Sequence, residues 1–141
     1  MTTSRTRRRA TLTALAAGAL LLTGCVHSPI DDVLESGTAV ELPNSLAEEQ
    51  SGLVELDTAR LLGEDSEGRR FHVARGGDTY GATNTICLIV DGLATGPMTG
   101  CGALPLEIAS DEVRVVLTYD PDLGADDDDA ERVGDYVVVF D

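Results

Sequence analysis

From residue 53 onward the sequence falls into short runs rich in Val, Ile, Leu and Tyr, each bounded by Gly, Pro, Asp or Ser. Apolar runs of about four to eight residues between such turn residues are typical of strands. The runs cover residues 58–64, 69–75, 85–90, 98–104, 113–119 and 136–140. About six short strands with almost no helical periodicity predict an all-β fold, either a small sandwich or a partly open barrel.

Two of these runs carry more specific signals. Residues 65–68 read Asp-Ser-Glu-Gly, with Asp first and Gly last as in a type I turn, so we expect a β-hairpin between the flanking runs. The run at 85–90 is apolar on both faces, which predicts a central strand that is covered on both sides.

A short helix is expected ahead of the first strand. The spacing of Ser45 and Glu48 fits a capping box and predicts a helix over about residues 46–50. Residues 25–43 show no sustained periodicity, so we expect a flexible acidic tether there. A single folded domain would then span residues 44–141.

Residues 1–24 have the features of an export signal. Four Arg between residues 5 and 9 precede a stretch of Ala, Leu, Thr and Gly at 10–22. This stretch has the length of a signal-peptide apolar region and is too short to cross a hydrocarbon layer of about 30 Å. No later apolar run reaches about 18 residues, so the sequence predicts no membrane-spanning helix.

Residues 22–25, Leu-Thr-Gly-Cys, resemble the lipobox of bacterial lipoprotein precursors. The resemblance implies cleavage after Gly24, a diacylglyceryl group on the sulfur of Cys25, and usually acylation of the new amino terminus, for example with palmitate. Several acyl chains would anchor the protein firmly in a membrane. We therefore expect a lipoprotein on the outer face of the cytoplasmic membrane, exported by the general secretory route. The alternative is an ordinary secretory signal with an unmodified Cys25.

A wider pattern also resembles known sequences. It comprises Ala-Arg-Leu-Leu-Gly-Glu at 59–64, Val-Ala-Arg at 73–75, Ile-Cys-Leu-Ile-Val at 86–90 and Gly-Cys-Gly at 100–102. Together with the lipobox, it resembles a group of small actinobacterial lipoproteins of uncharacterised function. Those proteins have no assigned activity, so the resemblance implies no catalytic residue.

Two cysteines remain once Cys25 is committed to lipid. An even pair in an exported chain predicts a disulfide, here between Cys87 and Cys101. The turn residues at 91–92 lie where a returning chain would bring the two together. There is no C-x-x-C motif and no flanking cation to lower a thiol pKa, so we expect a structural bond rather than a redox site.

The charge of the chain decides which partners are excluded. All ten cationic residues are Arg, and the net charge is −15. Removal of residues 1–24 leaves six Arg against 25 acidic residues, a net charge of −19. Such a chain lacks the cations that neutralise nucleic-acid phosphates. We expect the lipid anchor on Cys25 to bind the membrane, and the partner to be an unidentified protein or envelope component, since a cationic surface would be steered toward the domain.

Catalytic residues and cofactors are not expected. His27 would lie at the membrane surface, two residues from the anchor, and His72 alternates with Arg70 on a strand face that we expect to be open to solvent. A serine triad would need His72 as base, but the sequence has no G-x-S-x-G turn. A zinc site would have one His and no free Cys. An exported hydrolase with an unrecognised site stays as an alternative.

The acidic stretch 120–131 is the remaining candidate metal site. Aligned to a twelve-residue EF-hand loop, it places acids at positions 1, 3, 7, 9 and 12, which are Asp120, Asp122, Asp126, Asp128 and Glu131. Position 5 is Gly124, and position 6 is Ala125 instead of the Gly that the sharp turn requires. We expect a solvated loop without metal. Weak calcium-dependent binding through this loop is the alternative function.

Overall fold

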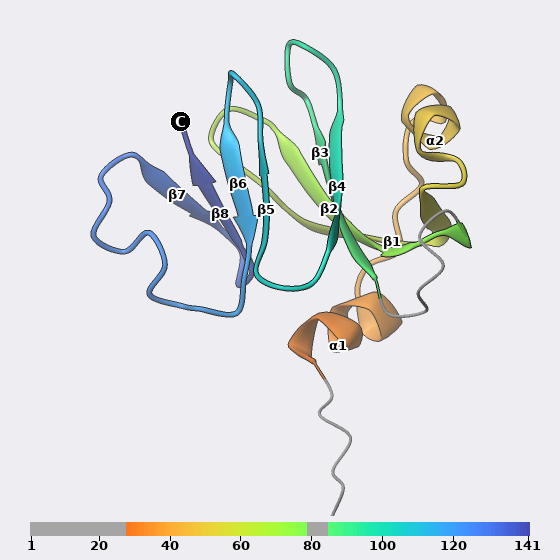
Figure 1. Ribbon diagram of the computed structural model, residues 1–141, viewed down its shortest axis with the longest axis horizontal. Coiled ribbons are helices and arrows are strands. Elements are labelled where there is room, and N and C mark those ends of the chain that lie inside the picture. Colours follow the sequence, from red (N-terminus) through yellow and green to blue (C-terminus); the bar gives the residue numbers. More distant parts are fainter. Residues whose placement is uncertain (1–27, 79–84) are drawn as a thin grey trace, which may run out of the picture.

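The computed structural model describes residues 28–78 and 85–141, and it is mostly β. Eight strands form two four-stranded antiparallel sheets, preceded by two short helices (Figure 1). The expected all-β class is confirmed. The expected signal peptide, the lipidation site Cys25 and His27 lie outside the described residues. Within the described residues, no helix has the length and apolar character needed to cross a bilayer.

The first sheet is a meander in chain order. Its strands are β1 (Val54–Glu64), β2 (Arg70–Gly76), β3 (Ile86–Asp91) and β4 (Met98–Gly102). The predicted hairpin joins β1 to β2: the Gly68 N–H donates to the Asp65 carbonyl over 3.1 Å, and Gly68 has a φ of 81° that favours glycine. Residues 86–90 of β3 are all buried, as a doubly covered strand requires.

The second sheet has the order β5-β6-β8-β7. Its strands are β5 (Leu106–Ala109), β6 (Arg114–Leu117), β7 (Ala130–Val133) and β8 (Val137–Phe140). The sequence did not predict β5 or β7. Each has only four residues, and β7 begins inside the acidic stretch 120–131, so neither stands out as an apolar run.

The main core lies between the two sheets. Fully buried side chains from both sheets meet there: Phe71, Val73 and Leu88 from the first, and Val115, Leu117, Val137 and Val139 from the second. The sheets also approach each other at both edges. A Cβ on Gly100 of β4 would collide with Ile108 of β5, and a Cβ on Gly63 of β1 would lie 2.6 Å from Val133 of β7. The architecture is therefore a small sandwich that closes partly into a barrel.

The flexible tether expected over residues 25–43 is wrong for the helix α1 (Pro29–Ser36). Pro29 and two acids occupy its first turn, where a missing N–H and negative charge are both favourable. Ile30 and Leu34, four positions apart, are buried in the main core. The folded unit therefore begins well before residue 44.

A second, smaller core covers the outer face of the first sheet. Ala74, Cys87 and Ile89 of that face pack with Leu42 and with Leu46 of α2 (Asn44–Gln50). The short helix is thus confirmed, although it starts at Asn44 after Pro43 and Ser45 is not its N-cap.

The disulfide between Cys87 and Cys101 is also confirmed. The two residues are register partners on β3 and β4, with Cα atoms 4.0 Å apart. The bond lies on the same outer face as the smaller core and ties two strands beneath it.

Candidate functional site

His72 is not the exposed side chain that its alternation with Arg70 suggested. It is 1 % exposed, and neither ring nitrogen has a hydrogen-bond partner among the described residues. Burial lowers the pKa of His72, and the charge of Arg70 lowers it further, while Asp91 acts in the opposite direction. The expectation failed because the outer face of β2 is covered. His72 lines neither of the two hollows described below.

The acidic loop does not bring the five EF-hand positions together. Glu131 is part of β7, and its carboxylate accepts hydrogen bonds from the Ser66 N–H and hydroxyl over 2.9 and 2.6 Å. Asp120 instead accepts from the N–H of Asp122 within the loop. The loop borders an open hollow of about 740 Å³. Within the described residues, no three His, Cys, Asp or Glu side chains are placed to share a metal ion.

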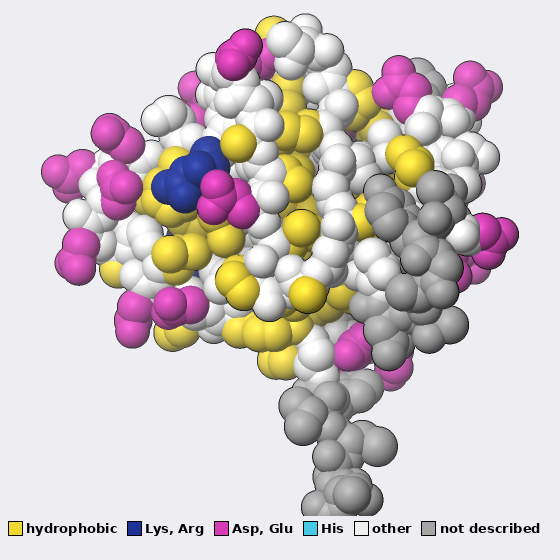
Figure 2. Space-filling model, viewed as in Figure 1, with side chains coloured by type: hydrophobic (Ala, Val, Ile, Leu, Met, Phe, Trp, Pro, Cys, Tyr) yellow, Lys and Arg dark blue, Asp and Glu magenta, His cyan; other side chains and the backbone are white. Residues whose placement is uncertain are grey.

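The six Arg of residues 28–141 all have partners inside the chain. Arg69 pairs with Asp65 and Asp141, Arg70 with Asp91, Arg75 with Asp31 and Arg114 with Glu107, while Arg60 and Arg132 donate to backbone carbonyls. The chain has no Lys. Figure 2 shows acidic side chains spread over one face with very little dark blue among them. Most surface carboxylates therefore have no cation of their own chain to pair with.

Arg69 is the most deeply buried of these paired arginines. Its side chain is 5 % exposed and contacts Asp65 at 2.5 Å and Asp141 at 2.7 Å, which joins the β1–β2 turn to the end of the chain. Burial alone would lower the Arg69 pKa, but hydrogen bonds with the two carboxylates raise it above its ordinary value. The charge of Arg69 is therefore neutralised within the chain by Asp65 and Asp141.

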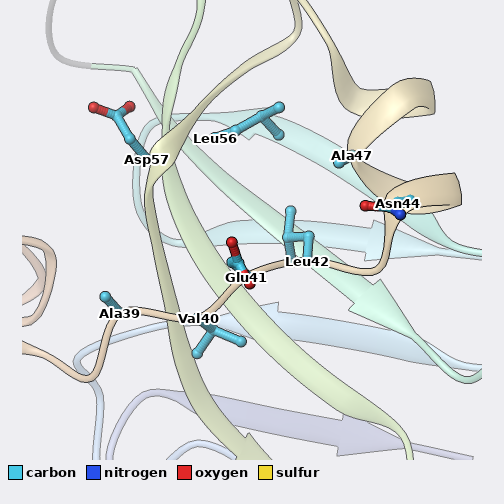
Figure 3. Close-up of a pocket in the computed structure, with 8 residues that line it drawn as sticks. All are labelled: Ala39, Val40, Glu41, Leu42, Asn44, Ala47, Leu56 and Asp57. Carbon is cyan, nitrogen blue, oxygen red and sulfur yellow. The ribbon is translucent and has the colours of Figure 1, made fainter.

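An open groove lies between residues 39–42, α2 and β1 (Figure 3). Its volume is about 560 Å³, and its lining residues are Ala39, Val40, Glu41, Leu42, Asn44, Ala47, Leu56 and Asp57. At one end Ala39 forms an isolated antiparallel bridge with Arg60, and the Val40 N–H donates to the Ala59 carbonyl over 3.4 Å. Beyond this bridge the two segments separate, and α2 closes the other end. We call this hollow the α2–β1 groove.

A bulge in β1 explains why the segments separate. Glu55 pairs with Arg75 and Arg60 with Val73, so residues 56–59 of β1 lie opposite a single residue of β2. The Thr58 hydroxyl fixes the bulge: it donates to the Glu55 carbonyl over 2.6 Å and accepts from the Arg75 N–H over 2.8 Å. A bulge bends its strand and redirects side chains. Here it places Leu56 and Asp57 on the wall of the α2–β1 groove.

The α2–β1 groove combines an apolar floor with an anionic rim. Leu42 is buried, and Ala47 and Leu56 are half-buried. Glu41 and Asp57 are exposed, and their carboxylates have no ion-pair partner among the described residues. Figure 3 shows Glu41 and Leu42 on one wall, Leu56 and Asp57 on the other, and α2 at one end. Such a surface suits a ligand with both apolar and cationic groups.

Comparison with protein-family models, with curated proteins and with solved structures found no match for this chain. The α2–β1 groove is therefore assigned on its own geometry. Sequence analysis assigned a binding role to none of its lining residues: residues 39–42 were expected to belong to a tether, and Ala47 to a short helix. The available signal was Leu42, an apolar residue that follows Glu41 directly ahead of the expected helix.

Proposed function

We propose that this protein is a lipoprotein held by Cys25 on the outer face of the cytoplasmic membrane, with a β domain that acts as a non-enzymatic binding module. The α2–β1 groove carries the binding role, because it is an open hollow with an apolar floor and with two carboxylates that have no ion-pair partner among the described residues. The anchoring role is supported by the lipobox resemblance at residues 22–25.

The position of α1 sets how such an anchored domain would lie. Pro29, the first residue of α1, follows Cys25 by only four positions, and Ile30 and Leu34 fix the helix in the core. Four residues span at most about 14 Å when fully extended. The anchored domain would therefore sit close to the bilayer with α1 nearest to it. In Figure 1 α2 lies well apart from α1, so the α2–β1 groove would stay accessible.

Membrane fractionation tests the anchor. We expect Cys25→Ala to release the protein from membranes or to block its processing, whereas the conservative lipobox variant Thr23→Ala should stay membrane-bound. Intact-mass analysis of the mature wild-type protein should show an acylated Cys25. A wild-type chain that is soluble, unmodified and begins at another residue would refute the proposed anchor.

Site-specific photo-cross-linking tests the binding role. A photoreactive residue in place of Ala47 would sit in the α2–β1 groove, and the same residue in place of Ala125 would sit in the acidic loop. We expect a discrete adduct in membranes from position 47 that is lost when Glu41→Gln and Asp57→Asn are added. The same adducts from both positions would contradict a binding role for the groove.

A further inference from the structure

We propose that the α2–β1 groove binds an extended peptide segment in which Arg or Lys alternates with apolar residues, supplied by another exported protein. This names the partner of the groove that the proposed function uses, and so it depends on that site being the binding site.

The shape of the surface favours a linear ligand. A second hollow of about 460 Å³ shares Asn44, Ala47 and Leu56 with the α2–β1 groove and continues to Glu48 and Ser51. The two hollows form one furrow that runs along α2. At its start, residues 39–40 already pair with β1 as an antiparallel strand would. Extended peptides bind in this manner beside a strand edge, with alternate side chains entering side pockets.

The apolar floor selects a peptide over a simple cation. Ala47 and Leu56 present half-buried carbon surface along the furrow, beside the buried Leu42. Covering this surface is favourable only for a ligand that brings apolar groups of its own. A polyamine offers charge with little side-chain area, so it should bind less well than a peptide.

The charges select a cationic partner. Glu41, Asp57 and Glu48 line the furrow, and none of its lining residues is Arg or Lys. Among the ion pairs of the described residues, none joins an Arg to these carboxylates. Arg60 lies beside the groove, but its guanidinium donates to the backbone carbonyls of Asp57 and Ala59 over 3.0 and 2.9 Å. Attraction to a cation is also stronger beside an apolar surface than in open water. Arg suits such a site because its planar group can pair with a carboxylate through two hydrogen bonds.

The acidic loop provides a control within the same molecule. It carries six Asp between residues 120 and 129, more negative charge than the furrow has. If net charge alone attracted cationic peptides, they would bind at the loop at least as well as at the furrow. Specific recognition in the α2–β1 groove should instead depend on Glu41 and Asp57.

Calorimetric titration and chemical-shift mapping test the proposal. The protein is the mature chain with Cys25→Ala, so that the result does not depend on lipidation. The probe is the acetylated and amidated peptide Gly-Leu-Arg-Leu-Arg-Leu-Gly, with comparison peptides in which Gln or Glu replaces both Arg, and with spermidine. We expect the Arg peptide to bind more tightly than the other three probes. Its largest shifts should fall on residues 39–57.

A pair of charge-matched variants sharpens the test. Glu41→Gln/Asp57→Asn should lower the affinity for the Arg peptide about tenfold, because two partly sheltered ion pairs are lost. Asp126→Asn/Asp128→Asn, which removes the same charge from the acidic loop, should change the affinity less than about twofold. All four side chains are exposed, so both variants should fold, which an unchanged melting temperature would verify.

Several results would overturn the proposal. The first is an equal loss of peptide affinity in the two variants, and the second is that the largest chemical-shift changes fall on residues 120–129. The others are that spermidine binds as tightly as the Arg peptide, or that the Arg peptide does not bind at millimolar concentration. Any of these results would refute the proposal that the groove binds a cationic peptide, but would not affect the proposal that Cys25 anchors the protein. If membrane fractionation shows no anchoring by Cys25 while the Arg peptide still binds, the anchor is refuted and the peptide proposal is retained.

Discussion

The two faces of the first sheet are both buried, but by very different covers. The inner face packs against a complete second sheet through aliphatic and aromatic side chains such as Phe71 and Leu88. The outer face packs against the seven-residue helix α2, Leu42 and apolar residues of β1 such as Val54 and Ala59. The disulfide, His72 and Thr99 lie on this outer face, and the last two have buried polar atoms without hydrogen-bond partners among the described residues.

The difference indicates a division of roles. A helix of seven residues is not stable by itself, so α2 is held mainly by its contacts with the sheet. A cover of this kind adds little rigidity but can leave a groove open, whereas a second sheet fills the space between. The inner face therefore supplies most of the stability, and the outer face supplies the surface that we propose for binding.

Adjacent residues of β3 allow the comparison to be tested directly. Leu88 and Ile89 are both fully buried, but Leu88 belongs to the inner core and Ile89 to the outer one. We expect Leu88→Ala to lower the free energy of unfolding by about 4–5 kcal/mol and Ile89→Ala by about 2–3 kcal/mol, because the thin outer cover can collapse onto a cavity. Denaturant unfolding measures both. Equal losses would show that the two covers are equally rigid.

The disulfide is the next largest expected effect. Cys87→Ala/Cys101→Ala removes a cross-link between residues 14 apart, which should cost about 3 kcal/mol by the chain-entropy estimate. Thermal melts of the variant and of the reduced wild-type protein should agree. If reduction leaves the melting temperature unchanged, the outer cover does not need this bond.

The buried His72 should make stability depend on pH. Burial and Arg70 lower its pKa in the folded state below the ordinary 6.5, so the unfolded chain takes up protons first as the pH falls. The stability associated with neutral His72 is complete above about pH 6.5 and decreases as the pH falls from there toward the folded-state pKa. His72→Phe should flatten this slope between about pH 5 and 7. A slope that persists in the variant would assign it to other groups.

The carboxylates of the α2–β1 groove should matter little for folding. Glu41→Gln/Asp57→Asn removes exposed charges without ion-pair partners among the described residues, so stability should change by at most about 0.5 kcal/mol. A loss above about 1 kcal/mol would mean that these groups support the fold, and would weaken their assignment to binding.

The acidic loop gives the smallest expected effect. We predict that calcium chloride and sodium chloride at matched ionic strength shift the melting temperature alike, since both screen the repulsion among the loop carboxylates. A calcium-specific shift that disappears in Asp122→Asn/Asp128→Asn would instead establish a calcium site.

The sequence determined those features that depend on neighbouring residues. Alternating apolar residues and the Asp-Ser-Glu-Gly turn specify the β1–β2 hairpin, and the continuous apolar run at 86–90 specifies a strand buried on both sides. The paired Cys87 and Cys101 were also identifiable, because an exported chain with two remaining cysteines favours a disulfide.

Only the tertiary structure decided what covers each surface. Nothing local to His72 shows that the sheet face on which it lies packs against α2 and Leu42. The strand β7 forms because it pairs with β8. The α2–β1 groove likewise depends on a bulge in β1 and on a helix that precedes it in the chain. Burial and open space arise from the distances between segments remote in sequence, whereas periodicity reports only the local conformation of each segment.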